Sequence, residues 1–139
     1  MQRYLWEETY SVGVKEIDQQ HQHFFEIVNS IIELTEQKNI IIRNLLLKIT
    51  ELSDYGSYHL STEESIFKNY NYPGAEDHIV AHDIYRQEII KFIAESEKEN
   101  VDVKELSLKI ASFAGIWLAG HIMMLDKEYE VFMHEAGIK

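Results

Sequence analysis

The chain has 139 residues, of which 45% are hydrophobic and 12% aromatic, enough to fill one compact core. This composition excludes intrinsic disorder, and the absence of cysteine excludes disulfide scaffolds, thiolate metal sites and cysteine nucleophiles. Thirteen Lys and Arg residues against 24 Asp and Glu residues give a net charge of −11, which opposes binding to nucleic acids and anionic membranes. Neither a signal peptide nor a run of 18 apolar residues is present. We therefore expect a soluble, cytoplasmic protein without nucleic-acid or membrane partners.

Long helices account best for the pattern of apolar residues. One proline and six glycines are too few for the many turns of an all-β protein. Apolar side chains recur at helical spacing in three segments, residues 18–38, 40–70 and 74–98. Residues 1–17 lack a regular period, so they predict an N-terminal arm packed across the helices.

A fourth helix follows a capping signal. Asp102, with Glu105 three residues later, resembles a capping box, and the apolar face that begins there runs through Leu118. Its continuation is expected to reach about residue 136. Because the four helices are joined by only a few residues each, we expect an all-α, up-down-up-down four-helix bundle. The expected organisation is one domain over residues 1–139, with the bundle at 18–136.

Histidines and carboxylates interrupt the apolar faces at one level of this bundle. Neighbouring helices are antiparallel, so residues equally far from the connecting turn lie at the same height, at about 1.5 Å per residue. With turns at Asn39, Tyr72 and Asn100, every helix brings a potential metal ligand to one layer. The residues of this layer are His21, His59, Glu63, His78, His82 and His121.

Two pairs in this layer have chelating geometry. His59 with Glu63, and His78 with His82, are four residues apart and share a helix face. Burying such groups without partners would cost several kcal/mol, so they require a bound partner. With Asp126 included, five imidazoles and two carboxylates exceed what one metal uses, which predicts a dinuclear site. The ligand types suit iron without excluding other first-row metals.

Asp126 poses a geometric problem. It follows His121 by five residues, which places it roughly 140° away around a regular helix. A π-bulge would bring the two side chains onto one face, so we expect the fourth helix to be distorted there.

The motifs around these residues resemble those of the hemerythrin family, and the resemblance covers nearly the whole chain. Trp6, the segment 13–18 and Phe25 fit the bacterial members. The motifs are QQH at 19–21, HLSTEE at 59–64, Tyr72-Pro73, His78-x3-His82, and WLAGH at 117–121 followed by Asp126.

The resemblance implies a non-haem di-iron centre, with a bridging oxo or hydroxo group, that binds dioxygen reversibly for storage, delivery or sensing. It implies that His78, His82 and His121 hold one iron, His21 and His59 hold the other, and Glu63 and Asp126 hold both. This count leaves an open position for dioxygen on the two-histidine iron. A dry apolar pocket is expected beside that iron. Its residues would be Phe24, Leu60, Phe67, Trp117 and Leu118, with Phe67 standing where many members carry methionine.

Other functions compete with this one. A di-iron enzyme acting on peroxide or nitric oxide could use the same scaffold, and a sensor could transmit oxygenation through the arm or the fourth helix. The dipeptide His82-Asp83 resembles the HD metal phosphohydrolases. Oxidase-type di-iron bundles need Glu-x-x-His motifs, which the chain lacks. His23 and His134 match no ligand position, and we expect both at the surface.

Overall fold

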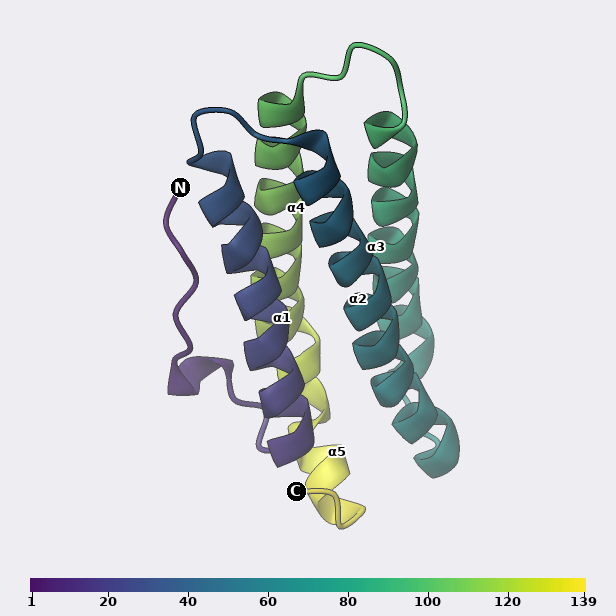
Figure 1. Cartoon of the computed structure of the whole chain (residues 1–139). Helices are drawn as coiled ribbons and strands as arrows, with labels where there is room; N and C mark the ends of the chain where they lie inside the picture. Colours follow the sequence, from purple (N-terminus) through teal and green to yellow (C-terminus); the bar gives the residue numbers. More distant parts are fainter.

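The computed structural model describes residues 1–139 and contains helices but no strands. Figure 1 shows four long helices side by side, running alternately up and down, with short connections at the two ends. The expected all-α, up-down-up-down bundle is therefore confirmed. The long helices are α1 (Lys15–Thr35), α2 (Ile42–Tyr70), α3 (Ala75–Ser96) and α4 (Val103–Met124).

The helix ends follow local chemistry. Asp102 caps α4, because its side chain accepts a hydrogen bond from the backbone N–H of Glu105 at 3.0 Å. At the end of α2, Asn71 adopts a left-handed conformation with φ 57°, which ends the helix as the sequence predicts. The connection that follows is short, so α3 begins at Ala75 and runs antiparallel to α2.

The N-terminal arm lies along α1, and a short 3-10 helix, η1 (Glu8–Tyr10), interrupts it. The backbone N–H and C=O of Tyr4 each form a 2.8 Å hydrogen bond with the side chain of Asn29. The Tyr4 ring stacks on Phe25 with centroids 5.2 Å apart. The predicted arm is thus confirmed, although its last three residues, 15–17, belong to α1.

The chain after α4 differs from the sequence-based expectation. In place of a π-bulge, α4 ends at Met124 and is followed by a 3-10 helix, η2 (Asp126–Tyr129), and then by α5 (Glu130–Glu135). The expected distortion between His121 and Asp126 is therefore confirmed, whereas the π-bulge and the continuous helix are wrong. Leu125, with φ −117°, turns the chain out of the helix, and the tighter 3-10 winding then places Asp126 in the interior.

This C-terminal segment is fastened to the arm. The Lys127 ammonium group donates hydrogen bonds to the carbonyl oxygens of Thr9 and Ser11 at 3.0 and 3.1 Å. The His134 ring, half-buried, donates from Nε2 to the carbonyl oxygen of Gly13 at 2.6 Å. His134 is therefore only partly exposed and forms a structural contact that was not expected, whereas His23 is exposed as expected.

A close approach between α2 and α3 shapes the core. The buried Tyr85 of α3 donates its hydroxyl hydrogen bond to the carbonyl oxygen of Leu52 at 2.9 Å. Its ring lies directly over Gly56, where an added Cβ atom would be 2.7 Å from the ring atom Cε1. Glycine at this position therefore allows the two helices to come this close, one turn before His59.

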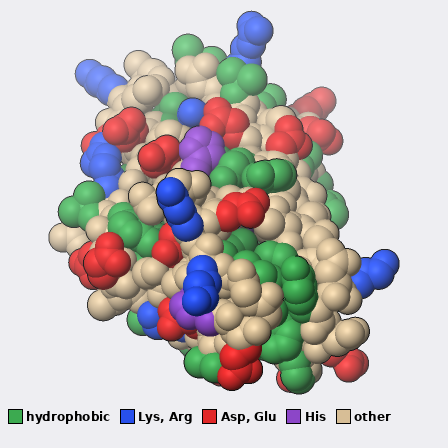
Figure 2. Space-filling view, turned by 90° about the horizontal axis from the view of Figure 1, so that it is seen from below, with side chains coloured by type: hydrophobic (Ala, Val, Ile, Leu, Met, Phe, Trp, Pro, Cys, Tyr) green, Lys and Arg blue, Asp and Glu red, His purple; other side chains and the backbone are tan.

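The surface mixes charged and apolar groups. Figure 2 shows one end of the bundle, where acidic, basic and hydrophobic side chains alternate and hydrophobic groups gather along one edge. The helical stretch Val103–Glu135 is long and apolar enough to cross a membrane by length and composition, and 39% of its most apolar window is buried in the bundle. Core helices of bundles share these properties, so the absence of a membrane partner stays a prediction.

Two glycine substitutions should have opposite effects on stability. Gly56→Ala should lower the free energy of unfolding by about 1–3 kcal/mol, because the new methyl group overpacks against the fixed Tyr85 ring. Gly120→Ala, in α4, meets no atom within 4 Å and should raise stability by about 0.5–1 kcal/mol through helix propensity alone. Urea denaturation of the metal-free proteins measures both. Equal stability of the two variants would contradict this account of the α2–α3 contact.

Candidate metal centre

The structure brings all seven residues of the predicted ligand set into one buried layer. His21 lies on α1, His59 and Glu63 on α2, His78 and His82 on α3, and His121 on α4, while η2 supplies Asp126. The apolar face of each long helix is turned toward the core, and the ligand-type residues lie on those faces. All seven side chains are buried.

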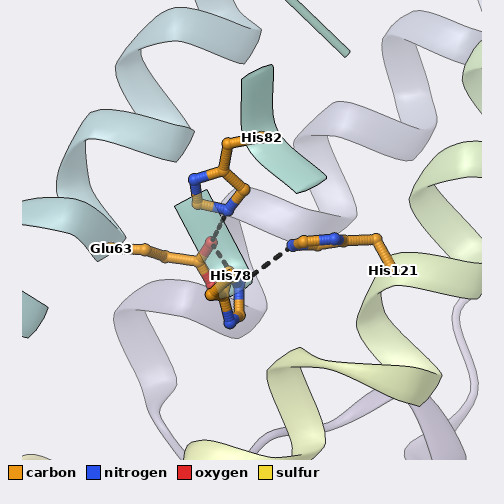
Figure 3. A group of neighbouring side chains, drawn as sticks. All are labelled: Glu63, His78, His82 and His121. Atoms are coloured by element: carbon orange, nitrogen blue, oxygen red, sulfur yellow. Dashed lines mark hydrogen bonds and ion pairs between the residues drawn. The ribbon is translucent and has the colours of Figure 1, made fainter. Parts of the chain in front are cut away.

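The first of two groups of side chains contains three histidines. Figure 3 shows Glu63, His78, His82 and His121 converging from three helices on one point. Their ligand atoms all lie within 4.8 Å of one another. Nε2 of His82 is 3.1 Å from Oε1 of Glu63, and Nε2 of His78 is 3.0 Å from Nε2 of His121. This group has the donors of a metal site.

The second group contains two histidines, His21 and His59, with Glu63 and Asp126, again within 4.8 Å of one another. Nε2 of His21 is 3.0 Å from Oδ2 of Asp126. The other carboxylate oxygen of Asp126, Oδ1, is 2.8 Å from Nε2 of His78. Both carboxylates therefore lie between the two histidine groups, where each can serve two metals.

The hydrogen-bonding state of these side chains tests whether they fit metal ions. Several of their nitrogen and oxygen atoms are fully buried and approach one another without forming hydrogen bonds of acceptable geometry. Each unsatisfied buried polar atom costs about 1–3 kcal/mol. Cations at the centre would satisfy all of these atoms except one nitrogen of His21, because only one nitrogen of each ring can face a metal. Imidazole nitrogen with carboxylate oxygen is a donor set that suits iron. Every unsatisfied buried side-chain atom of the protein belongs to the seven residues, namely to His21, His59, Glu63, His82 and Asp126.

The protonation of the carboxylates favours cation binding. Burial alone would raise the pKa of Glu63 and of Asp126, but the surrounding histidines outweigh it and hold both pKa values below their usual range. Both groups are therefore anionic at neutral pH. Burial lowers the pKa of His59 to about 4, so that ring is neutral and ready to bind a metal.

His78 is different. Burial would lower its pKa, but the neighbouring carboxylates of Asp126 and Glu63 raise it to about 9. In the metal-free protein this ring therefore carries a proton at neutral pH, and a metal must displace it.

Hydrogen bonds from outside the ligand set hold several ligand-type side chains. The Nδ1–H of His59 donates to Oε1 of Gln20 at 2.7 Å, and the Nδ1–H of His82 donates to Oε2 of Glu64 at 2.7 Å. The buried Tyr129 hydroxyl donates a short hydrogen bond to Oε2 of Glu63. The bonds at Nδ1 of His59 and His82 leave Nε2 of both imidazole rings directed at the centre.

The sequence analysis assigned no role to Gln20, Glu64 or Arg86. Two of them stand inside the motifs quoted above, Gln20 immediately before His21 and Glu64 immediately after Glu63. Their position inside these motifs was the sequence signal by which Gln20 and Glu64 could have been found. Their actual partners lie on other helices, 39 residues away for Gln20 and 18 for Glu64, and the spacing within one helix cannot indicate them.

The five apolar residues expected to line a pocket divide between the two groups. Phe24 contacts His59 with ring centroids 6.0 Å apart, and Leu60 and Leu118 are fully buried. Phe67 packs against His78 at 4.8 Å, and Trp117 stacks on His121 at 4.4 Å.

The expected positions of Phe67 and Trp117 beside the two-histidine group therefore need correction. Phe67 lies one turn after Glu63, on the side away from His59, and Trp117 lies one turn before His121. Each ring consequently covers a histidine of the three-histidine group.

The phosphohydrolase alternative finds no support in the geometry. The Asp83 side chain is 57% exposed and forms an ion pair with Arg86 at 3.0 Å. His82, its neighbour in sequence, points into the core instead. Successive residues on a helix point about 100° apart, so the two cannot share a buried metal.

Comparison with known proteins agrees with this arrangement. The model of the hemerythrin HHE cation binding domain matches residues 12–131. The chain is 25% identical over 128 residues to bacteriohemerythrin from Clostridium acetobutylicum, covering 91% of this chain and 98% of that protein. It is 24% identical over 125 residues to a hemerythrin-like protein from Naegleria gruberi, covering 90% of this chain and 89% of that protein.

Solved structures show the same fold. Wild-type hemerythrin superposes with a TM-score of 0.74 at 23% sequence identity, covering 91% of this chain and 95% of that one. A leucine-to-tyrosine variant of hemerythrin gives a TM-score of 0.75 at 22% identity, covering 94% and 96%. Because the family model spans most of the sequence, this chain belongs to the hemerythrin family of HHE cation-binding proteins.

Proposed function

We propose that this protein binds two non-haem iron ions and uses them to bind dioxygen reversibly, for oxygen storage, delivery or sensing. The observation that carries the proposal is the pair of buried donor groups that share Glu63, one with three histidines and one with two. When bound, two irons joined by an oxo or hydroxo group supply the reversible electron transfer that dioxygen binding needs. Membership of the hemerythrin family supports this choice of metal and ligand.

In this proposal the protein side chains have distinct tasks. His78, His82 and His121 hold one iron, His21 and His59 hold the other, and Glu63 and Asp126 contact both. The two anionic carboxylates offset part of the charge of the cations in a buried site. The smaller number of histidines in the second group leaves room for dioxygen on that side.

Apolar side chains exclude water from the two-histidine side of the centre. Phe24 packs against His59, and Leu60 and Leu118 are fully buried in the same core. We propose that these three wall the dioxygen pocket, with Trp117 closing the adjacent side over His121. Excluding water protects bound oxygen from protonation and loss in a reduced form.

Binding accounts for the comparisons better than catalysis does. The matched relatives are hemerythrins and hemerythrin-like proteins, not enzymes. Turnover of peroxide or nitric oxide therefore has no observation that favours it. The cytoplasmic location and the lack of a nucleic-acid partner stay predictions.

Reversible dioxygen binding can be tested directly. Anaerobically iron-loaded protein should contain two irons per chain and should change its visible spectrum in air, then recover it under nitrogen, because binding involves no net consumption of oxygen. His59→Ala should abolish the reversible change, since it removes one of two histidines from the proposed oxygen-binding iron. His23→Ala, at an exposed histidine of α1, should leave it intact. Irreversible oxidation of the parent protein in every cycle would contradict the proposal.

Metal affinity should increase with pH. The pKa of His78 is raised to about 9, so at any lower pH the metal competes with a proton on this ring. Apparent affinity for Zn²⁺ should therefore rise by up to about tenfold per pH unit between about pH 6.5 and 8.5. His59, with its pKa lowered to about 4, adds nothing in this range.

Calorimetric titrations in buffers of different ionisation enthalpy measure the protons released. A release of about one proton from His78 is expected near neutral pH. An affinity that does not change over this range would show that His78 is already neutral in the metal-free protein, or that it is not a ligand.

A further inference from the structure

A chain of hydrogen bonds runs from the partly exposed Arg86 through Glu64 to the buried His82. Oε2 of Glu64 accepts from Nδ1–H of His82 at 2.7 Å and from Arg86 at 2.8 Å, while Oε1 of Glu64 accepts from Arg86 at 3.0 Å. Arg86 thus holds the carboxylate with both of its terminal nitrogens. This two-point contact fixes the plane of the carboxylate and so the direction from which it meets the imidazole.

The contact determines which nitrogen of His82 can bind a metal. Because Nδ1 carries the proton that Glu64 accepts, the lone pair is left on Nε2, which lies 3.1 Å from Oε1 of Glu63 in the centre. His82 is one turn before Arg86 on α3, and Glu64 comes from α2, so the chain also ties these two helices together at the height of the centre.

The corresponding contact on the other side of the centre is uncharged. His59 donates its Nδ1–H to the side-chain amide oxygen of Gln20 at 2.7 Å, and the Gln20 amide nitrogen donates to Thr62 at 3.4 Å. An anionic acceptor draws the Nδ1 proton more strongly than an amide does, and this makes the opposite nitrogen a better electron donor. The acceptor at Nδ1 therefore differs between the two histidine groups: it is a carboxylate for His82 and an amide oxygen for His59.

We propose that Glu64, held by Arg86, is a positioning residue that fixes the orientation and tautomer of His82 and makes it a stronger ligand than His59, which adds to the difference between the two metal sites. This inference rests on the proposed metal centre and goes beyond it, because it assigns part of the difference between the two sites to groups that bind no metal.

The test compares three full-length variants. Glu64→Gln keeps an acceptor for His82 but loses the charge, and Glu64→Ala removes the acceptor. Asp83→Asn is the matched control, because Asp83 also pairs with Arg86, at 3.0 Å, but its side chain is exposed and is not the acceptor for Nδ1–H of His82. Each variant removes one negative charge, so general electrostatic effects are the same in all three.

The first measurement is nuclear magnetic resonance of the imidazole groups, using Zn²⁺ as a diamagnetic probe. In the parent, the Nδ1 proton of His82 should resonate farther downfield than that of His59, because its acceptor is anionic. Glu64→Gln should move the His82 proton upfield toward the position of His59, and Asp83→Asn should leave it in place. An unchanged His82 proton in Glu64→Gln would overturn the inference.

The second measurement is metal affinity. Glu64→Ala should weaken Zn²⁺ binding about 10–100-fold, as loss of such partners does in other metal sites, with Glu64→Gln in between and Asp83→Asn within about twofold of the parent. In the iron-loaded protein, Glu64→Gln should raise the reduction midpoint, because a weaker donor stabilises the ferric state less. A loss of affinity in Asp83→Asn equal to that in Glu64→Ala would overturn the inference.

Failure of the proposed metal centre would give a different result from failure of this inference. A parent protein that binds no Zn²⁺ and no iron would reject the proposed function, and the His82 resonance of the metal-free protein would still report the contact with Glu64. A parent that binds two metals while all three variants match it would reject only this inference.

Discussion

The structure depends on the burial of two anionic carboxylates, Glu63 and Asp126, among five histidines in the centre of a helical bundle. Such a cluster is unfavourable by itself, because charges are removed from water and several polar atoms lack partners. It is maintained because each side chain is held by a rigid helix or by a hydrogen bond from outside the cluster. The remaining instability is the driving force for metal binding, since cations supply the missing partners.

Most of the surrounding architecture serves to hold this cluster. Gly56 lets Tyr85 bring α2 and α3 together one turn from His59, and Gln20 and Glu64 fix the rings of two histidines. Asp126 needs more support because it follows the end of α4. Its neighbour Lys127 binds the carbonyl groups of the arm, and so the N-terminal segment stabilises the position of a carboxylate more than 100 residues away.

Sequence periodicity was sufficient to predict the bundle and the convergence of six polar residues, whereas the place of Asp126 came from the resemblance to the hemerythrin family. Antiparallel helices with short turns fix the height of each residue, and His21 and His59 meet because they are nearly equidistant from the same turn. The sequence did not show how α4 ends. The turn at Leu125 is followed by a contact between Lys127 and the arm, and neither feature leaves a periodic signal in the sequence. Nor did it show that Phe67 covers His78, because the side of Glu63 on which a residue lies depends on the packing of a second helix.

Crystals of the iron-loaded protein would test the central claim most directly. An anomalous difference map measured at the iron absorption edge should contain two peaks in the core. One should lie beside His78, His82 and His121 and the other beside His21 and His59, with Glu63 and Asp126 between them. A single peak, or peaks that leave either histidine group without a metal, would contradict a centre built from two unequal groups that share their carboxylates.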